Sequence, residues 1–353
     1  MNRHKVKTIQ IGQVKIGGDA PVTVQSMTKT DTRNAKKTIR QIKRLEKAGC
    51  EIIRVAVPDE EAVRQLSTIK KNISIPLIAD IHFDHKLAIK SIQEGADAIR
   101  INPGNISDNK KIVEIIKTAH EYNIPIRIGV NAGSLEKHLL TKYHGPTPEA
   151  LVESALNHIK TFEDIGFYQI KLSLKSSNIN DTVHAYRLIA KKTDYPLHLG
   201  ITEAGPLLRG SIKSAIGLGI LLAEGIGDTI RVSLTDAPLK EIQVAYEILK
   251  GLEIRKRGVE IISCPTCGRC QVDIIKLTRQ IEKKLAYILK PIKVAVMGCV
   301  VNGPGEAREC DIGIAGGKGQ GVLFRKGKII KKIREPDLLQ ALMEEVENYA
   351  QSL

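Results

Sequence analysis

Segments typical of strands alternate with segments typical of helices along about the first 250 residues of the chain. Eight strands alternating with helices over about 250 residues are typical of a TIM (β/α)8 barrel. A doubly wound sheet fits less well, because no GxGxxG motif follows the first strand candidate. The predicted strands are residues 22–27, 51–57, 76–83, 97–103, 125–131, 169–175, 196–203 and 229–235.

A polar, glycine-punctuated linker at residues 251–258 divides the chain into two predicted domains. We therefore predict an α/β TIM barrel in residues 1–255, followed by a small α+β domain in residues 259–353. The helices predicted for the barrel are residues 34–48, 59–71, 84–94, 108–122, 148–164, 178–193 and 210–224. The small domain is predicted to contain strands at 259–263, 292–298 and 311–315, helices at 271–289 and 336–350, and a hairpin around Lys326–Gly327.

Five of the predicted barrel strands carry a basic residue at a similar position. Strand side chains alternate between two faces, so each basic residue shares its face with small or polar neighbours such as Gly129, Asn131 and Ser173. These residues either lie outside, under the helices, or form a polar layer at the barrel mouth. We favour the mouth, where a buried ring of cations requires an anionic ligand, and a diphosphate suits arginine forks. The basic residues are Arg54, Arg100, Arg127, Lys171 and Arg231.

Acidic and imidazole groups fall at the ends of two predicted strands. Asp80 and His82 end one strand, and Glu203 ends another. TIM-barrel catalytic groups come from the carboxyl ends of several strands. A single histidine is more often structural than catalytic, but the three groups together make these strand ends candidate catalytic positions.

The stretch Ser263–Glu306 holds a dense group of cysteines. Cys264, Cys267 and Cys270 are each separated by two residues, and Cys299 follows later. A zinc site, a four-thiolate [4Fe–4S] cluster and a cluster with a non-cysteine ligand all fit a tight turn of thiolates. One run followed by single cysteines favours iron–sulfur, since zinc ribbons usually show two separate C-x2-C knuckles. Spacing alone does not decide among Cys270, Cys310 and Glu306 for the remaining ligand position.

The composition bounds the partners and the compartment. A net charge of +15 suggests an acidic partner, but an aromatic content of 3% without tryptophan argues against nucleic acid. No apolar run of about 18 residues occurs, so we predict no membrane span. The N-terminus lacks a signal-peptide pattern, and the clustered cysteines do not resemble a disulfide framework. We therefore predict a cytoplasmic protein.

Several long motifs resemble one enzyme family over most of the chain. CPTC and GCVVNGPGE, together with the barrel segments VQSMT, RVAVP, ADIHF, RINPGN, RIGVN, LGITEAG and GIGDTIRVSL, are similar to the 4-hydroxy-3-methylbut-2-enyl diphosphate synthases of the non-mevalonate isoprenoid pathway. The length resembles the bacterial two-domain form. The resemblance implies a [4Fe–4S] cluster held by three cysteines and one glutamate, at Cys264, Cys267, Cys299 and Glu306. Cys270 and Cys310 lie outside the family pattern.

The resemblance also implies a reaction and its partners. The reaction is reductive ring opening of 2-C-methyl-D-erythritol 2,4-cyclodiphosphate, with two single electrons from ferredoxin or flavodoxin. A homodimer is expected, in which each active site is completed by the partner subunit. Glu203 is the candidate proton donor, with Asp80 and His82 nearby, and Lys171 is a weaker candidate for the diphosphate. Following the charge, we assign the diphosphate to Arg54, Arg100, Arg127, Asn131, Lys175 and Ser233.

Two other functions remain as alternatives from the residues alone. A zinc-stabilised nucleic-acid binder would use the positive charge, and it would be colourless. A phosphate-handling barrel enzyme of the pterin-binding type would use its tail only for structure. Iron and sulfide content distinguishes the nucleic-acid binder from the predicted enzyme. The dependence of turnover on Cys299 and Glu306 distinguishes the pterin-binding type of barrel enzyme.

Overall fold

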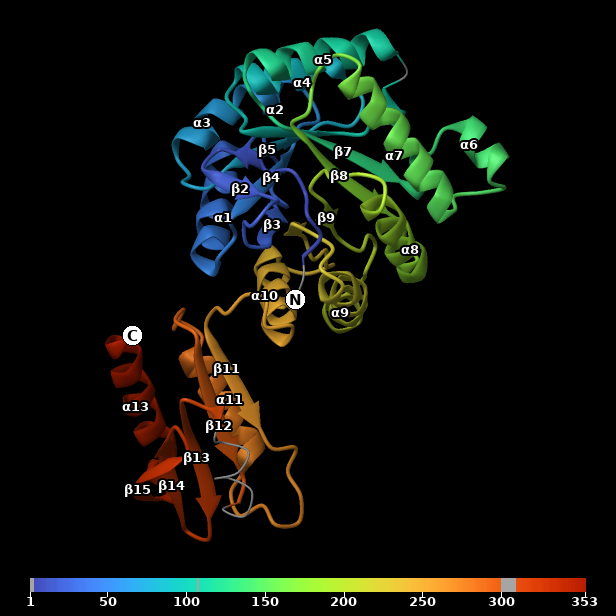
Figure 1. Ribbon diagram of the computed structural model, residues 1–353. Coiled ribbons are helices and arrows are strands. Elements are labelled where there is room, and N and C mark those ends of the chain that lie inside the picture. Colours follow the sequence, from blue (N-terminus) through green and yellow to red (C-terminus); the bar gives the residue numbers. More distant parts are fainter. Residues whose placement is uncertain (1–2, 107, 300–308) are drawn as a thin grey trace. The chain divides into compact units, whose positions relative to one another are not determined.

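The first part of the chain is a barrel of parallel strands in a computed structural model, which describes residues 3–106, 108–299 and 309–353. Two compact units divide the chain, Met1–Arg255 and Lys256–Leu353. In the first unit, an eight-stranded parallel sheet within the described residues runs in the order β8-β7-β6-β5-β4-β3-β10-β9, and helices surround it (Figure 1). This confirms the predicted TIM barrel. The strands are β3 (Thr23–Met27), β4 (Ile52–Ala56), β5 (Leu77–Asp80), β6 (Ala98–Ile101), β7 (Ile126–Asn131), β8 (Ile170–Lys175), β9 (His198–Leu199) and β10 (Thr229–Ile230).

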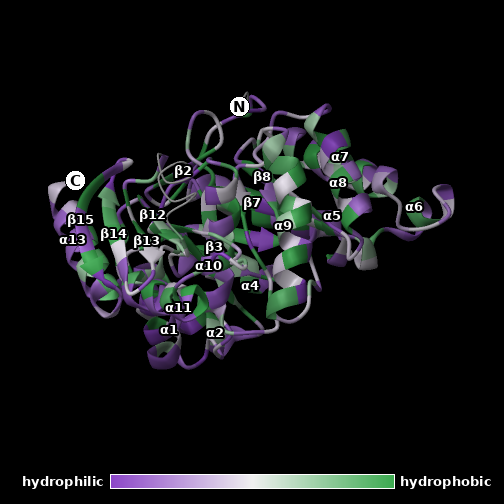
Figure 2. Cartoon of the chain, turned by 90° about the horizontal axis from the view of Figure 1, so that it is seen from below, coloured by the Kyte–Doolittle hydropathy of each residue, from purple (hydrophilic) through white to green (hydrophobic). Residues whose placement is uncertain are grey.

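Short polar side chains start many of the surrounding helices. Asn34, Asp84 and Asp108 each accept a backbone N–H from the first turn, which satisfies a donor that the helix itself leaves free. Most helices carry both hydrophilic and hydrophobic residues (Figure 2). No helix in the described ranges has the length and apolar character to cross a membrane. The helices are α1 (Ala35–Ala48), α2 (Glu60–Arg64), α3 (Leu66–Lys71), α4 (His85–Gln93), α5 (Asn109–Glu121), α6 (Lys137–Lys142), α7 (Pro148–Glu163), α8 (Ile179–Ala190), α9 (Leu207–Ala223) and α10 (Pro238–Gly251).

Three details differ from the sequence prediction. The helix predicted at 59–71 is divided at Gln65 into α2 and α3, and α6 and α10 were not predicted. The strands predicted at 196–203 and 229–235 form regular ladders only over β9 and β10. Directly after β9, a Cβ atom on Gly200 would stand 2.9 Å from the carbonyl oxygen of Arg231. The two segments approach too closely there for ordinary side chains.

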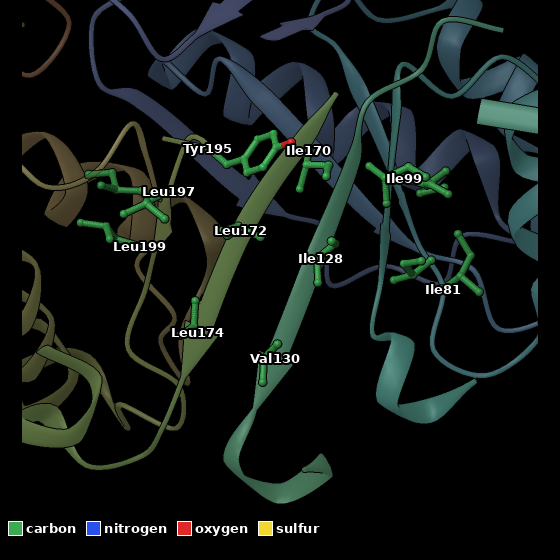
Figure 3. Packing of buried hydrophobic residues seen from close by; sticks show 14 of the residues in the cluster. Ile81, Ile99, Ile128, Val130, Ile170, Leu172, Leu174, Tyr195, Leu197 and Leu199 are labelled. Atoms are coloured by element: carbon green, nitrogen blue, oxygen red, sulfur yellow. The ribbon is translucent and has the colours of Figure 1, made fainter. Parts of the chain in front are cut away.

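The outer face of the barrel is its hydrophobic core. Ile128 and Val130 of β7, and Leu172 and Leu174 of β8, are each 3% exposed or less and point to one side of their strands (Figure 3). They belong to one cluster with residues of α7 such as Leu151. Because strand side chains alternate, the residues between them face the barrel interior. The outer face therefore carries the packing and leaves the inner face available for polar groups.

A hairpin closes the amino end of the barrel. Strands β1 (Ile9–Ile11) and β2 (Val14–Ile16) pair antiparallel. Their isoleucines pack against Ile52, Ile78 and Ala98, which lie near the starts of β4, β5 and β6. The carboxyl ends of the strands are thus the end where a ligand can enter.

A tyrosine completes the seam between β8 and β9. A parallel bridge between Leu172 and Leu197 joins these two strands. The hydroxyl of Tyr186, on α8, accepts the N–H of Leu174 at 3.1 Å and donates to the carbonyl oxygen of His198. Tyr186 is fully buried, so its hydroxyl links both strands of the seam without access to water.

The second unit is a five-stranded mixed sheet with two helices, within the residues described. Its strand order is β11-β12-β13-β14-β15, with the first three strands parallel. The predicted hairpin around Lys326–Gly327 is confirmed, and both residues have the positive φ that a tight hairpin turn requires. The predicted helix at 271–289 is shorter, because Asp273 caps it by accepting the N–H of Lys276. The elements are β11 (Val259–Ser263), α11 (Ile274–Leu285), β12 (Ile292–Met297), β13 (Ile312–Gly317), β14 (Gln320–Arg325), β15 (Lys328–Arg334) and α13 (Leu338–Ser352).

The seam gives a stability prediction. Tyr186→Phe leaves a buried N–H and a buried carbonyl without the hydroxyl, so we expect a loss of about 1–3 kcal/mol in the free energy of unfolding. Urea unfolding followed by circular dichroism measures it. Tyr122→Phe is the control, because Tyr122 is half exposed at the surface. Equal unfolding midpoints for the two variants would contradict the role of Tyr186 in the seam.

Candidate active site

One row of side chains crosses four neighbouring strands inside the barrel. Asp80, Arg100, Arg127 and Lys171 stand opposite one another in the registers of β5 with β6, β6 with β7, and β7 with β8. All four are between 1% and 5% exposed. Residues paired in register share a face of the sheet, so the four side chains lie on the same side. The row has one acid and three basic residues, where TIM barrels usually carry branched aliphatic residues.

A cavity of about 630 Å³ opens at the carboxyl ends of the strands. Its wall brings together all the predicted diphosphate residues and the three predicted catalytic residues of the barrel. Lys171 does not belong to the wall, among the residues described; it lies buried. The predicted residues in the wall are Arg54, Arg100, Arg127, Asn131, Lys175, Ser233, Asp80, His82 and Glu203.

Asp80 is the counterion of two arginines in this wall. Its Oδ1 lies 3.2 Å from Arg100 Nη1, and its Oδ2 lies 3.4 Å from Arg54 Nε. Burial by itself raises the pKa of Asp80, but Arg54, Arg100 and Arg127 outweigh burial and lower that pKa to about 2. Asp80 is therefore ionised at neutral pH, and it orients the two guanidinium groups.

A second buried acid, Glu241 on α10, holds the other side of the wall. Its carboxylate accepts the N–H of Leu234 at 3.1 Å and the hydroxyl of Ser26 at 3.2 Å. It also lies 3.4 Å from Lys29 Nζ and 4.0 Å from Arg231 Nε. Glu241 thus places a negative charge near Arg231, which lines the cavity.

The positive charge of the wall exceeds what these two acids neutralise. Arg127 Nε and Nη1 and Arg100 Nε are buried without a hydrogen-bond partner in the described part of the chain. Burial, with Arg127 and Arg54 nearby, lowers the pKa of Lys175 well below its usual range. Buried charges are stable only when they are paired, so the cavity is built for an anion.

Gly129 makes room for Arg100. A Cβ atom at this position of β7 would stand 2.8 Å from Arg100 Nε and 2.9 Å from Nη2. Any other residue would force the guanidinium out of its position. The glycine on the inner face of β7 is thus part of the binding geometry.

Glu203 and His82 are the exposed acid and imidazole of the wall. Glu203 has a φ of 52°, in the left-handed region that residues other than glycine rarely adopt. Such strain often accompanies a functional position. His82 Nε2 lies 3.8 Å from Asp80 Oδ2 and 3.5 Å from Arg100 Nη1. Burial outweighs the attraction of Asp80 and lowers the pKa of His82.

The cysteines of the second unit lie at the carboxyl ends of two neighbouring parallel strands. Cys264 follows β11 directly, and Cys299 follows β12 after Gly298. The N–H of Gly298 donates to Cys264 Sγ at 3.3 Å. A Cβ atom on Gly298 would stand 2.4 Å from Cys270 Sγ and 3.4 Å from Cys264 Sγ, so these sulfur atoms gather around the glycine.

The donor chemistry of these loops fits an iron–sulfur cluster. All six cysteines are free thiols, Cys267 is exposed, and a backbone N–H already points at the Cys264 sulfur. No three His, Cys, Asp or Glu side chains in the described residues are grouped to hold a metal ion, and the predicted ligand Glu306 lies outside those residues. Cys310 is buried in an apolar cluster with Met297 and Phe324, against which Cys264 also packs, and burial raises the pKa of its thiol.

Comparison with known sequences assigns both units to one family. A model of the GcpE TIM-barrel domain matches residues 6–246, and a model of the GcpE protein C-terminal domain matches residues 260–348. The chain belongs to the GcpE family. The 4-hydroxy-3-methylbut-2-en-1-yl diphosphate synthase (flavodoxin) of Caldanaerobacter subterraneus subsp. tengcongensis is 61% identical over 345 residues, which cover 98% of this chain and 97% of that protein. The enzyme of the same name from Clostridium acetobutylicum is 59% identical over 348 residues, with 99% and 100% covered.

Solved structures of other enzymes share the barrel. The N-acetylneuraminic acid synthetase of Leptospira borgpetersenii superposes with a TM-score of 0.52 at 14% identity, covering 72% of this chain and 91% of that chain. The dihydropteroate synthase of Yersinia pestis gives 0.50 at 16% identity, covering 70% and 97%. Identities this low support the fold alone. The assignment of this chain to the GcpE family rests on the sequence matches alone.

Sequence reasoning left two residues of the site unassigned. Arg231 was noted as a basic strand residue but was not assigned to the diphosphate, although it lies two positions before Ser233 on the same face. Glu241 was missed, because its helix was not predicted and its partners Ser26 and Lys29 lie at the other end of the barrel sequence. The sequence did contain a signal for Arg231: its strand position matches that of the basic residues that were assigned to the diphosphate.

Gly129→Ala tests the geometry of the wall. We expect roughly a tenfold or greater loss of affinity for inorganic diphosphate, about 1.4 kcal/mol, because the methyl group displaces the Arg100 guanidinium. Isothermal titration calorimetry measures the dissociation constant. Gly219→Ala is the matched control, since a Cβ atom there meets nothing within 4 Å. Equal affinities for the two variants would show that Arg100 does not depend on Gly129.

Proposed function

We propose that the cavity of the barrel binds a cyclic diphosphate for reduction. The chain is a 4-hydroxy-3-methylbut-2-en-1-yl diphosphate synthase, an oxidoreductase of the non-mevalonate isoprenoid pathway. We assign the diphosphate to this cavity because its wall, in a GcpE-family barrel, contains more buried positive charge than its acids neutralise. The substrate is 2-C-methyl-D-erythritol 2,4-cyclodiphosphate, whose ring is opened reductively. Residues 1–255 are the substrate-binding domain, and residues 259–353 carry the cluster.

The diphosphate is held by three arginines, one lysine and short polar groups. Arg54, Arg100 and Arg127 offer guanidinium forks that match phosphate oxygens, and Lys175 adds a point charge. Asn131 and Ser233 supply neutral hydrogen bonds at the rim. The proposal is supported by the two ion pairs of Asp80, which orient the Arg54 and Arg100 forks before the ligand arrives.

We assign the proton donor to the exposed side of the wall. Besides the ring opening, the reaction removes one hydroxyl group of the substrate as water, so an acid must reach the oxygen atom of that group. We assign this step to Glu203, which is solvent-accessible and lines the cavity. Asp80, with a pKa lowered to about 2, carries no proton at neutral pH and therefore acts by orienting the arginines. His82 Nε2 lies 3.8 Å from Asp80 Oδ2, so it borders the Asp80 carboxylate at the exposed side of the wall.

The second unit would hold a [4Fe–4S] cluster on Cys264, Cys267, Cys299 and Glu306. When bound, the cluster supplies the two electrons of the reduction one at a time. The N–H of Gly298 donates to the Cys264 sulfur, and a donor in this position stabilises a thiolate ligand. Cys270 donates its thiol hydrogen to the carbonyl of Val272 at 3.2 Å, which supports a role outside the ligand set.

The proposed partners are a flavodoxin and a second copy of the chain. The names of the relatives include flavodoxin, which we propose as the electron donor. In the homodimer, each active site would be completed by the partner subunit. An apolar face on α9 supports self-association. Leu208, Ile212 and Ile216 recur every four residues along this helix and are 74%, 51% and 48% exposed. We place the enzyme in the cytoplasm, where its thiols stay reduced.

Turnover of the cyclodiphosphate with reduced flavodoxin tests the function. We expect Arg127→Met to lower kcat/KM by roughly 100-fold or more, because it removes buried charge-assisted hydrogen bonds to the diphosphate. Arg187→Met is the matched control: Arg187 pairs with Glu224 at the surface. Anaerobic assays of enzyme with equal iron content make the comparison. No turnover by the wild-type enzyme, or full activity of Arg127→Met, contradicts the proposed function.

Iron and sulfide content tests the ligand set. Cys267→Ala and Glu306→Ala are expected to lose turnover, and Cys267→Ala also most of its iron, since each removes a proposed ligand. Cys270→Ala is expected to keep both, because its sulfur is engaged with Val272. Anaerobic purification with iron and sulfide analysis measures the outcome. Loss of the cluster in Cys270→Ala would return Cys270 to the ligand set.

A further inference from the structure

Lys171 is a buried basic residue below the cavity that the proposed mechanism does not use. It lies on β8, is 1% exposed and is not part of the cavity wall as described. Its Nζ has no hydrogen-bond partner among the described residues. Burying a charged amine without a partner costs free energy, so a lysine at this position lowers the stability of the empty barrel if it stays protonated.

Positive charge surrounds Lys171 on its own sheet. Arg127 stands opposite it in the register of β7 with β8, and Lys175 lies four residues further along the same strand. Arg54 on β4 also acts on it across the barrel. The permanent charges of Arg127 and Arg54 disfavour protonation of the Lys171 amine.

The other neighbouring groups do not neutralise it. His198 on β9 is buried, its Nδ1 lies 2.7 Å from Thr229 Oγ1, and burial lowers its pKa well below the usual range. Asp228 is the acid that attracts Lys171, but its Oδ1 accepts from Arg3 Nη2 at 2.7 Å and its Oδ2 accepts from Leu197 N at 2.8 Å. Both oxygen atoms of the Asp228 carboxylate therefore already have partners other than Lys171.

Lysine and arginine respond differently to such surroundings. A guanidinium stays protonated in proteins, whereas a buried ammonium readily loses its proton. Burial, followed by repulsion from Arg127 and Arg54, lowers the pKa of Lys171 well below its usual range. An anion in the cavity would offset the field of the arginines and make the ammonium form favourable again.

We propose that Lys171 is a proton-accepting residue beneath the diphosphate site: it is a neutral amine in the empty barrel and becomes an ammonium group when the diphosphate binds. The inference rests on the proposed function. Lys171 does not touch the reacting atoms; it matches the charge of the barrel to that of its ligand, as a positioning residue. Binding of the substrate is then coupled to proton uptake.

The coupling has a definite sign. The complex holds more protons than the free enzyme, so affinity increases as the pH falls between the pKa of Lys171 in the free enzyme and its higher pKa in the complex. One proton changes the dissociation constant by up to tenfold per pH unit. Outside this window, both states carry the same number of protons, and the effect disappears.

Calorimetry on the oxidised holoenzyme measures the uptake directly. The cyclodiphosphate is titrated anaerobically without an electron donor, so that it binds but does not react. Each phosphorus of the cyclic ligand carries one strongly acidic oxygen, so the ligand does not titrate near neutral pH. Titrations in two buffers of different ionisation enthalpy, at pH values from ~6 to ~9, then count the protons taken up by the protein.

Substitutions separate Lys171 from the residues that contact the ligand. Lys171→Met is expected to take up fewer protons, the remainder belonging to Lys175 and His82, which both line the cavity. It should bind more weakly than wild type at pH values below the pKa of Lys171 in the complex, and the difference should shrink as the pH rises toward that pKa. Lys110→Met, on the exposed face of α5, is the matched control and should leave the uptake unchanged.

Two results overturn the inference. One is binding by the wild-type enzyme without proton uptake, and the other is an unchanged uptake in Lys171→Met. If Lys171→Met does not fold, as judged by circular dichroism and iron content, Lys171→Arg supplies the second variant. Its permanent charge should lower the uptake, and an uptake equal to that of wild type overturns the inference. Neither result affects the proposed function, which fails only if reduced flavodoxin gives no turnover.

Discussion

Unmatched positive charge inside the barrel is the constraint on which the rest of the structure depends. Arg54, Arg100 and Arg127 are buried in a layer that aliphatic residues fill in most TIM barrels. Asp80 neutralises part of this charge, and its ion pairs with Arg54 and Arg100 orient both side chains. The charge that remains lowers the stability of the empty barrel and favours an anion in its mouth. The same interaction thus weakens the free protein and strengthens the complex.

The scaffold tolerates this charge because it keeps packing and binding on opposite faces of the strands. The outer residues of β7 and β8 form the hydrophobic core with the helices, and a hairpin of isoleucines closes the amino end. Tyr186 links the two strands of the seam with its hydroxyl. Gly129 leaves the inner face of β7 open for Arg100. The hydrophobic core and the hairpin thus shield the polar layer from water on the outside and at the amino end, while the carboxyl ends stay open.

The alternation of strands and helices was enough to predict the barrel, because the period of each segment is a local property. Local alternation showed only that each basic residue shares its face with small or polar neighbours; the structure places that face inside the barrel, where Arg100 is in register with Arg127. Other features depend on contacts that no local pattern records. Glu241 reaches Ser26 from a position 215 residues away, and the ladders of β9 and β10 are short where Gly200 meets the Arg231 carbonyl. Spacing could not separate Cys270 from Glu306 either, because the number of residues between two side chains does not fix whether they meet in space.

The choice between lysine and arginine in the inner layer has a physical consequence. The three arginines stay charged whether or not a ligand is present, so they set the affinity for the diphosphate. A further permanent charge at position 171, without room for a counterion, would add repulsion to the empty barrel at every pH. A lysine avoids this repulsion by giving up its proton, and it regains the charge only when the anion is bound. The barrel can therefore carry more positive charge in the complex than it could hold when empty.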